Sequence, residues 1–329
     1  MVEVLIPVRL SDSIVAEFSA RHIVHKAWEA ADEAAFLAQI APRISAIATS
    51  AGILANGAVK MIDGPFMSQF PNLKLVANLG VGYDTIDAKW AAAHGIVVTN
   101  TPDVLTDETA DTAFGLVLNT VRRFSAAERY LRAGKWLEAP FPLTATLRNK
   151  TMGILGLGRI GKAIAKRGEA FGLQIAYSGR SRQADVAYPY FADARALAAH
   201  CDILVVAAPG GPETRNIVNA AVLEALGPNG FLINIARGSL IDDEALIAAL
   251  QKGTIAGAGL DVFVAEPQVP AALMEMEQVT LLPHVGSASV ETRQAMAGLF
   301  IGNVDSFAKT GRALTPVPEC AALAGRREG

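Results

Sequence analysis

TMGILGLGRIG, residues 151–161, is the stretch that decides the fold of this chain. It opens with a short apolar run typical of a β-strand, and a helical pattern follows it to Ala170. Three glycines stand between: Gly156 permits a tight turn, Gly158 lets a phosphate approach the backbone, and Gly161 lets helix and strand pack closely. Because a strand precedes these glycines and a helix follows them, the stretch predicts a dinucleotide-binding turn, with the pyrophosphate on the free N–H groups of the helix.

The segment after the next expected strand indicates which dinucleotide is bound. It carries Arg180 and Arg182 beside Ser178 and Ser181, and no acidic residue occurs between residues 173 and 184. An NAD-dependent enzyme places Asp or Glu here to bind the ribose 2′-hydroxyl. Two guanidinium groups and two hydroxyls suit a 2′-phosphate, which they can hold through charge-assisted hydrogen bonds. A solvated basic turn is the plain alternative, but directly after a dinucleotide fingerprint the pattern favours NADP(H).

Composition places the chain among compact globular proteins. It has 329 residues, 51% hydrophobic and 19% charged, which is enough for two separate cores. The net charge of −3 gives no reason to expect nucleic acid or an anionic membrane as a partner. Cys201 and Cys320 lie too far apart for a disulfide framework or a metal-binding spacing, which indicates a reducing compartment. Residues 1–8 resemble a strand rather than a signal peptide, and no apolar run is long enough to span a bilayer, so we expect a cytoplasmic protein without a membrane partner.

Short apolar runs alternate with helical patterns along almost the whole chain, which is typical of parallel α/β sheets. In the first hundred residues the expected strands are 4–8, 23–27, 45–49, 73–78 and 96–99. From residue 151 onward they are 152–155, 174–177, 203–207, 230–234, 255–259 and 279–282. The two groups predict two complete α/β units.

We therefore predict two doubly wound parallel-sheet domains with a cleft between them. A flavodoxin-like substrate domain comprises residues 1–100 plus 288–329, and a Rossmann cofactor domain comprises residues 101–287. A helical pattern with few breakers covers residues 107–133, and one helix of that length could join the domains or form an oligomer interface. A final helix, residues 290–309, could return the chain to the first domain.

Three ionisable residues of the second unit each follow an expected strand: Arg237, Glu266 and His284. In open parallel sheets ligands bind beyond the carboxyl ends of the strands, so all three are expected at one crevice. Each also has a plain explanation, namely a surface charge, a solvated Glu-Pro turn and a structural histidine. Their recurrence after three successive strands of a cofactor domain favours a shared catalytic role.

Several motifs resemble the D-2-hydroxyacid dehydrogenase family. They are GLGRIG (156–161), NIARGSLIDDEAL (234–246), GAGLDVF (257–263) with its following EP, and LLPHVGS (281–287) with a later ETR. Within that family the chain is similar to the NADPH-dependent glyoxylate/hydroxypyruvate reductases. It also resembles the plant hydroxyphenylpyruvate reductases through TNTPDVLTD (99–107) and YSGRS (177–181). The resemblance runs from about residue 73 to residue 318, and the first seventy residues match mainly in pattern.

This resemblance implies that Arg237, Glu266 and His284 are the Arg-Glu-His set of the family. The side-chain chemistry agrees, because Arg237 can pair with a substrate carboxylate and polarise the adjacent carbonyl. His284 can donate a proton to the oxygen while NADPH delivers hydride to the carbon. Glu266 can bond to the other ring nitrogen and fix the orientation of the imidazole.

The resemblance also implies further contacts with the substrate. The backbone of Val81 and Gly82 would grip the carboxylate, although an ordinary strand-to-helix turn is the plain alternative. Leu54 would line the pocket. Trp136 resembles the tryptophan that related reductases insert into the active site of the partner subunit, and a core or interface tryptophan is the alternative. The implied cofactor contacts are Gly156, Gly158, Arg159, Ile160, Gly161, Ser178, Arg180, Ser181, Arg182, Pro209, Thr214, Ile235, Ala236, Asp261, Gly286 and Thr109.

The sequence thus predicts an NADP(H)-dependent reductase that converts a small 2-oxo acid, glyoxylate or hydroxypyruvate, to the D-2-hydroxy acid in a homodimer. A bulkier (hydroxy)phenylpyruvate-like substrate is the alternative, and a non-catalytic, nicotinamide-sensing corepressor is a third reading. Glu266 argues against formate dehydrogenases, which carry Gln at that position. No metal site is expected, because His22 and His25 would point to opposite faces of a strand.

Overall fold

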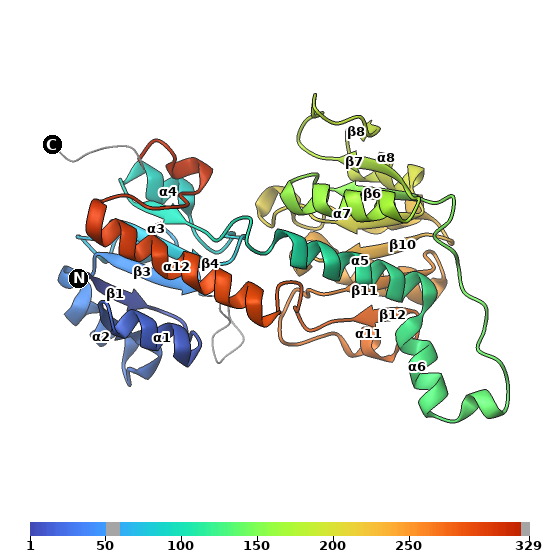
Figure 1. Ribbon diagram of the computed structural model, residues 1–329, viewed down its shortest axis with the longest axis horizontal. Helices are drawn as coiled ribbons and strands as arrows, with labels where there is room; N and C mark the ends of the chain where they lie inside the picture. The colour runs from blue at the N-terminus through green and yellow to red at the C-terminus, as the bar shows by residue number, and fades with distance from the viewer. Residues whose placement is uncertain (51–59, 324–329) are drawn as a thin grey trace. The chain divides into compact units, whose positions relative to one another are not determined.

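The computed structural model describes residues 1–50 and 60–323 and contains two compact units (Figure 1). One unit comprises residues 1–105 with the residues from 289 onward, and the other comprises residues 106–288. Each unit has its own parallel sheet and its own hydrophobic core. The predicted fold class, two parallel-sheet α/β domains, is therefore confirmed. Among the described residues, every helix is too short or too polar to cross a membrane.

The first unit is built on a five-stranded sheet in the flavodoxin-like order β2-β1-β3-β4-β5. Its strands are β1 (Glu3–Ile6), β2 (Ile23–Lys26), β3 (Ala46–Ser50), β4 (Leu75–Leu79) and β5 (Val97–Thr99). Its helices are α1 (Asp12–Ser19), α2 (Glu33–Ile40), α3 (Gly64–Met67), α4 (Ala88–Ala93) and α12 (Val290–Thr310). Val4, Leu5 and Ile6 are all fully buried, because helices cover both faces of the central strands.

Helix α12 brings the end of the chain back to the first unit. The side chain of Ser289 caps its start by accepting a hydrogen bond from the Thr292 N–H, and the helix ends at Gly311 in the left-handed conformation. Its buried Phe300 meets Phe18 of α1 edge-to-face, with ring centroids 5.3 Å apart. The first unit is thus closed by residues from both ends of the sequence.

The second unit carries a seven-stranded parallel sheet in the order β12-β11-β10-β9-β6-β7-β8. Read from β8, this is the Rossmann order, which reverses between β6 and β9. Its strands are β6 (Thr151–Leu155), β7 (Gln174–Ser178), β8 (Tyr190–Phe191), β9 (Ile203–Val206), β10 (Phe231–Asn234), β11 (Gly257–Leu260) and β12 (Val279–Leu281). All eleven expected strands of the chain are present, with bounds shifted by two residues or fewer. The two-residue β8 was not expected, because it is too short to show periodicity.

Helices cover both faces of this second sheet. Val205 and Ile233 face α5 (Thr106–Arg122) and α7 (Arg159–Ala170), which lie side by side in Figure 1. Their neighbours Leu204 and Leu232 face the opposite core, which includes side chains of α8 (Ala194–His200), α9 (Ala220–Leu226) and α10 (Asp243–Lys252). This alternation explains the continuous apolar runs in the sequence, since both sides of each central strand are buried.

The prediction of a single helix over residues 107–133 is wrong. Helix α5 ends at Arg122, Arg123 adopts a left-handed backbone with φ of +53°, and α6 (Phe124–Arg132) begins directly afterwards. The Asn119 side chain accepts a hydrogen bond from the Ser125 N–H at 2.9 Å and donates one to the Ser125 Oγ at 2.8 Å. These bonds satisfy backbone and side-chain groups at the break. None of the residues of α6 is buried, and Figure 1 shows the helix extending away from the sheet of its unit.

Candidate active site

The glycine turn after β6 has the geometry of an anion-binding helix start. A Cβ at Gly156 would overlap the backbone at Ala208, and a Cβ at Gly161 would overlap the Gly156 carbonyl oxygen. Gly158 differs, because its φ of −81° suits any residue and a Cβ there would meet nothing within 4 Å. No side chain at this N-cap occupies the first N–H groups of α7. The turn therefore leaves open, at the start of α7, the space that a pyrophosphate needs.

The loop after β7 presents the two arginines that the sequence singled out. Ser178 is buried at the end of the strand, whereas Arg180, Ser181 and Arg182 are exposed. Within the described parts of the chain, neither guanidinium group forms an ion pair or a hydrogen bond. The next acid along the chain, Asp185, pairs with Lys162 at 3.1 Å. Because Asp185 is engaged with Lys162, the positive charges of Arg180 and Arg182 beside the glycine turn are not compensated by it.

Three side chains that the sequence analysis did not single out hold this loop in place. The Tyr177 hydroxyl accepts a hydrogen bond from the Gln183 N–H at 2.7 Å. The Gln183 side chain donates to the Leu157 carbonyl in the glycine turn at 2.8 Å, and Tyr190 donates to the Gly179 carbonyl at 3.2 Å. The arginine loop is thus fixed against the glycine turn. A glutamine in a polar loop carries no sequence signal for such a role.

Glu266 and His284 form a hydrogen-bonded pair beyond the carboxyl ends of the adjacent strands β11 and β12. The distance from Glu266 Oε2 to His284 Nδ1 is 2.7 Å, and Glu266 Oε1 accepts the Phe263 N–H at 2.9 Å. The imidazole is about half exposed, and its Nε2 is not used by the carboxylate. Glu266 therefore fixes the ring through Nδ1 and leaves Nε2 for a ligand.

Arg237 follows β10, the next strand of the sheet, and completes the cluster. Its loop touches the chain after β11 so closely that a Cβ at Gly238 would overlap the backbone at Phe263 and Val264. Arg237 is close enough that its charge lowers the pKa of Glu266. The structure thus brings the three ionisable residues together, as expected from their positions after neighbouring strands.

The pKa of Glu266 lies below its ordinary value. Burial acts in the opposite direction and would raise it. The hydrogen bonds from His284 and from the Phe263 N–H, with the positive charges of His284 and Arg237, outweigh that effect. Glu266 is therefore held as a carboxylate, which can orient an imidazole but does not serve as a proton donor near neutral pH.

The turn that carries His284 is held by Asp261. His284 itself has a left-handed backbone with φ of +53°, and its N–H donates to the Asp261 carbonyl at 2.8 Å. The buried Asp261 carboxylate accepts the N–H groups of Val285 at 2.7 Å and Gly286 at 2.9 Å. Burial raises the pKa of Asp261, and these two hydrogen bonds oppose that rise. Its carboxylate is therefore engaged with its own chain on both oxygens.

Asn234 holds the Arg237 loop and was missed by the sequence analysis. This fully buried amide donates to the Arg237 carbonyl at 2.9 Å and accepts the Ala236 N–H at 3.0 Å. Ile235 is buried and Ala236 partly exposed between them. An asparagine at the end of an otherwise apolar strand is the signal that could have identified it.

The other expected cofactor contacts lie on loops and at helix starts of the same unit. A Cβ at Gly286 would lie 3.5 Å from Thr109 Cγ2, so α5 borders the His284 turn. Thr214 donates to the Pro209 carbonyl at 2.8 Å in the loop after β9, next to the glycine turn. Arg159 and Ile160 form the first turn of α7.

The remaining expected substrate contacts lie apart from this cluster in the sequence. Val81 and Gly82 follow β4 in the first unit. Trp136 belongs to a short 3-10 helix, Lys135–Leu137, after α6, with 67% of its surface exposed. Leu54 lies outside the described residues.

The comparison with known families identifies the chain. The protein-family model described as "D-isomer specific 2-hydroxyacid dehydrogenase, NAD binding domain" matches residues 114–286 of the sequence. The chain belongs to this family. The matched residues include the glycine turn, the arginine loop and all three ionisable residues of the cluster, and the resemblance inferred from the sequence motifs is confirmed.

Relatives within the D-2-hydroxyacid dehydrogenase family are similar over most of their length. The glyoxylate/hydroxypyruvate reductase A of Arabidopsis thaliana is 50% identical over 255 residues, which cover 78% of this chain and 82% of that one. The hydroxyphenylpyruvate reductase of Plectranthus scutellarioides is 42% identical over 314 residues, covering 95% and 98%. The crystal structure of the NADPH-dependent glyoxylate/hydroxypyruvate reductase of Sinorhizobium meliloti, in complex with NADP and malonate, is 47% identical. It covers 100% of this chain and 99% of its own, with a TM-score of 0.90.

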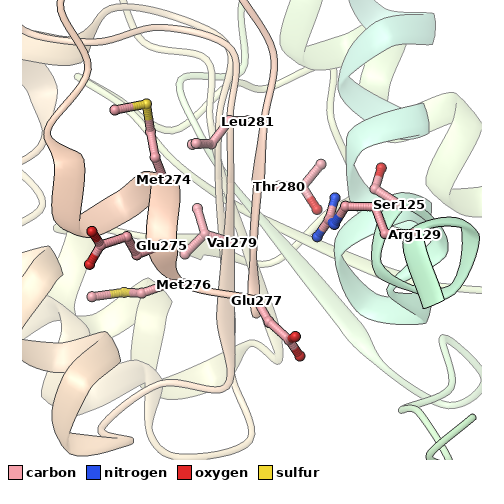
Figure 2. A pocket seen from close by; sticks show the side chains of 9 residues that line it. All are labelled: Ser125, Arg129, Met274, Glu275, Met276, Glu277, Val279, Thr280 and Leu281. Atoms are coloured by element: carbon pink, nitrogen blue, oxygen red, sulfur yellow. The ribbon is translucent and has the colours of Figure 1, made fainter. Parts of the chain in front are cut away.

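A pocket of about 370 Å³ in this dehydrogenase lies away from the residues expected at the site (Figure 2). Ser125 and Arg129 of α6 form one side. The other side is formed by residues at the end of α11 (Ala271–Glu275), after it and on β12, namely Met274, Glu275, Met276, Glu277, Val279, Thr280 and Leu281. None of the expected catalytic or cofactor residues lines it. It is a surface feature beside α6 and not part of the candidate active site.

Proposed function

We propose that this protein is an NADPH-dependent reductase that converts a small 2-oxo acid, glyoxylate or hydroxypyruvate, to the D-2-hydroxy acid. The observation that carries the proposal is the Glu266–His284 pair with Arg237 beside it, in the same unit as a glycine turn and two uncompensated arginines. Membership of the D-2-hydroxyacid dehydrogenase family and the names of the similar reductases support the reaction class.

In the proposed mechanism Arg237 pairs with the substrate carboxylate and polarises the neighbouring carbonyl. His284 donates a proton from Nε2 to the carbonyl oxygen as negative charge develops there. Glu266 keeps the ring oriented through Nδ1 and stabilises the imidazolium before transfer. When bound, NADPH supplies the hydride that the carbonyl carbon receives. The D configuration of the product is an inference from the family.

NADP(H) would be held by the loops around the switch between β6 and β9. The open space at Gly158 and the start of α7, which has no side-chain cap, fit the pyrophosphate. Arg180 and Arg182, with Ser178 and Ser181, would hold the 2′-phosphate. Thr109, Pro209, Thr214, Ile235, Ala236, Asp261 and Gly286 would line the remainder of the cofactor site.

The first unit would serve as the substrate domain. The backbone N–H groups of Val81 and Gly82 would provide a second grip on the carboxylate, and Leu54 would line the pocket.

We further propose a cytoplasmic location. Its support is that Cys201 and Cys320 are both free and buried, since proteins of oxidising compartments more often use their cysteines in disulfides. Burial also raises the pKa of the Cys201 thiol to about 12.

We also propose that the protein acts as a homodimer through the segment that follows α5. This segment exposes five large apolar side chains, which a monomer would leave in water. They are Phe124, Leu131, Trp136, Leu137 and Leu143. In such a dimer Trp136 would reach the active site of the partner.

The test is a matrix of initial rates with glyoxylate, hydroxypyruvate, phenylpyruvate and pyruvate, each with NADPH and with NADH. Fast NADPH-dependent turnover of glyoxylate or hydroxypyruvate supports the proposal. Faster turnover of phenylpyruvate would favour the alternative, which similarity to the hydroxyphenylpyruvate reductase over 95% of this chain supports. Preference for NADH contradicts the role of the arginines. Tight NADPH binding without turnover of any of the four acids would support a nicotinamide-sensing protein instead.

A further inference from the structure

The loop after β4 has all three of its carbonyl groups held by hydrogen bonds. The Asn78 side-chain amide donates to the carbonyls of Gly80 at 3.1 Å and Gly82 at 3.0 Å. The Asn100 side chain donates to the Val81 carbonyl at 2.9 Å, and the Thr101 N–H makes a second bond to Gly80 at 3.0 Å. One small loop thus has every carbonyl turned toward side-chain or backbone donors of its own unit.

In contrast to the carbonyl groups, only one of the three N–H groups of the same loop has a hydrogen-bond acceptor among the residues that the structure describes. The Gly80 N–H donates to Thr101 Oγ1 at 3.1 Å, but those of Val81 and Gly82 have no acceptor within the described residues. Val81 and Gly82 are both only partly exposed. With the carbonyls fixed on one side, two adjacent N–H groups are left to bind an anion. Gly80 makes the turn possible through its φ of +147°.

Asn78 is a buried polar residue whose hydrogen-bonding groups are only partly satisfied, so stability alone does not explain its presence. It is 1% exposed, and its Oδ1 is buried without a hydrogen-bond partner among the described residues. The reverse amide orientation would set Oδ1 against two carbonyl oxygens, so the two hydrogen bonds determine which way the amide points. A buried acceptor without a hydrogen bond costs free energy. The two hydrogen bonds that Asn78 donates hold the conformation of the loop, and they explain why an asparagine occupies this position.

We propose that Asn78 is the positioning residue of the substrate site: its amide orients the Gly80–Gly82 loop so that the Val81 and Gly82 N–H groups bind the substrate carboxylate. The inference rests on the proposed function and adds the residue that sets carboxylate affinity. Because the carboxylate is not the reacting group, this grip is the same in the ground state and the transition state. Its loss therefore raises KM and leaves kcat little changed.

The experiment compares Asn78→Leu, which keeps the side-chain volume without donors, and Asn78→Ala with the wild-type enzyme and with Val76→Ala. Val76 is fully buried two residues earlier on the same strand, and its apolar side chain cannot donate a hydrogen bond to the loop carbonyls, so it is the control for lost stability. Five quantities are measured for each protein. Steady-state kinetics give KM and kcat for glyoxylate, and calorimetry gives the Kd of oxalate for the NADPH-loaded protein and the Kd of NADPH for the free protein. Thermal unfolding gives Tm.

Both Asn78 variants are expected to raise KM for glyoxylate and Kd for oxalate by about tenfold or more, with kcat changed by less than about threefold. NADPH affinity is expected to stay at the wild-type value, because the cofactor loops belong to the other unit. Val76→Ala is expected to lower Tm without weakening oxalate. Wild-type oxalate affinity in a folded Asn78 variant, or equal weakening in Val76→Ala, overturns the role of Asn78 alone. A wild-type protein that neither binds oxalate nor reduces any 2-oxo acid overturns the proposed function itself.

Discussion

At the scale of single residues, His284 is the group whose replacement separates chemistry from binding. Its Nδ1 is occupied by Glu266, and its Nε2 is the atom proposed to donate the proton. We expect His284→Ala to lower kcat by about 10²–10⁴-fold, the usual contribution of a positioned acid. Stopped-flow titration of NADPH fluorescence checks that cofactor affinity is unchanged. A variant that turns over within a few-fold of wild type removes His284 from the mechanism.

The lowered pKa of Glu266 gives a prediction for stability in acid. A carboxyl whose pKa is lowered in the folded protein adds stability at pH values above its ordinary pKa of 4.5. This contribution is lost as the pH falls through the lowered value, because the proton breaks the pair with His284. Glu266→Gln lacks the titrating group, so the stability difference between wild type and variant should shrink on acidification from pH 6 to about pH 3. Urea unfolding at each pH measures it, and a difference independent of pH contradicts the assignment.

At the scale of elements, the glycine turn makes opposite predictions for two of its glycines. A methyl group at Gly158 meets no protein atom, so Gly158→Ala should change the free energy of unfolding by about 1 kcal/mol or less. That methyl group occupies the space expected for the pyrophosphate, so NADPH binding should weaken by about tenfold or more. Gly161→Ala overlaps a backbone carbonyl and should cost about 2 kcal/mol of stability or more. Urea unfolding and cofactor titration of both variants separate the two effects, and Gly158→Ala with wild-type NADPH affinity would exclude the turn as the cofactor site.

The arginine loop should decide between the two nicotinamide cofactors. The double variant Arg180→Ala/Arg182→Ala is expected to raise KM for NADPH by about tenfold or more and to leave KM for NADH within about threefold, since only NADPH carries the 2′-phosphate. Tyr177→Phe removes the acceptor of the Gln183 N–H and should move the ratio of the two KM values in the same direction by a smaller amount. Arg148→Ala, an exposed arginine before β6 at the other end of the strands, is the matched control. Equal losses with both cofactors would show that these arginines do not contact the phosphate.

The elements also show which features of the sequence determine the structure and which do not. The strands could be predicted because their apolar runs are buried on both faces, as the opposed Leu204 and Val205 illustrate. The break at Arg123 could not, because the helical periodicity continues through it and the bonds between Asn119 and Ser125 decide the conformation. Sequence reasoning could single out Arg237, Glu266 and His284, because each of them follows an expected strand. Asn78 and Asn234 were not singled out, because a buried amide bonded to a loop has no periodicity or motif of its own.

At the scale of the whole molecule, the exposed apolar segment after α5 makes a prediction about assembly. Leu137 and Leu143 have 94% and 101% of their surfaces exposed, which favours burial against a second copy. We expect the wild-type protein to behave as a dimer in light scattering and the double variant Leu137→Asp/Leu143→Asp to dissociate to monomers. Leu314→Asp, which changes an exposed leucine of the first unit, should leave the dimer intact. A wild-type monomer at micromolar concentration would contradict the proposed assembly.

The absence of a side chain at Gly238 has a consequence for protein engineering. Backbone meets backbone at this point, so the spacing between the guanidinium and the carboxylate depends on the main chain and cannot be restored by rotamer changes. Directed evolution toward larger substrates should therefore lose every library member mutated at residue 238, just as it loses those mutated at Arg237 or Glu266. Deep mutational scanning under selection for turnover would reveal residue 238 as intolerant even of alanine, although it has no side chain that could take part in the reaction.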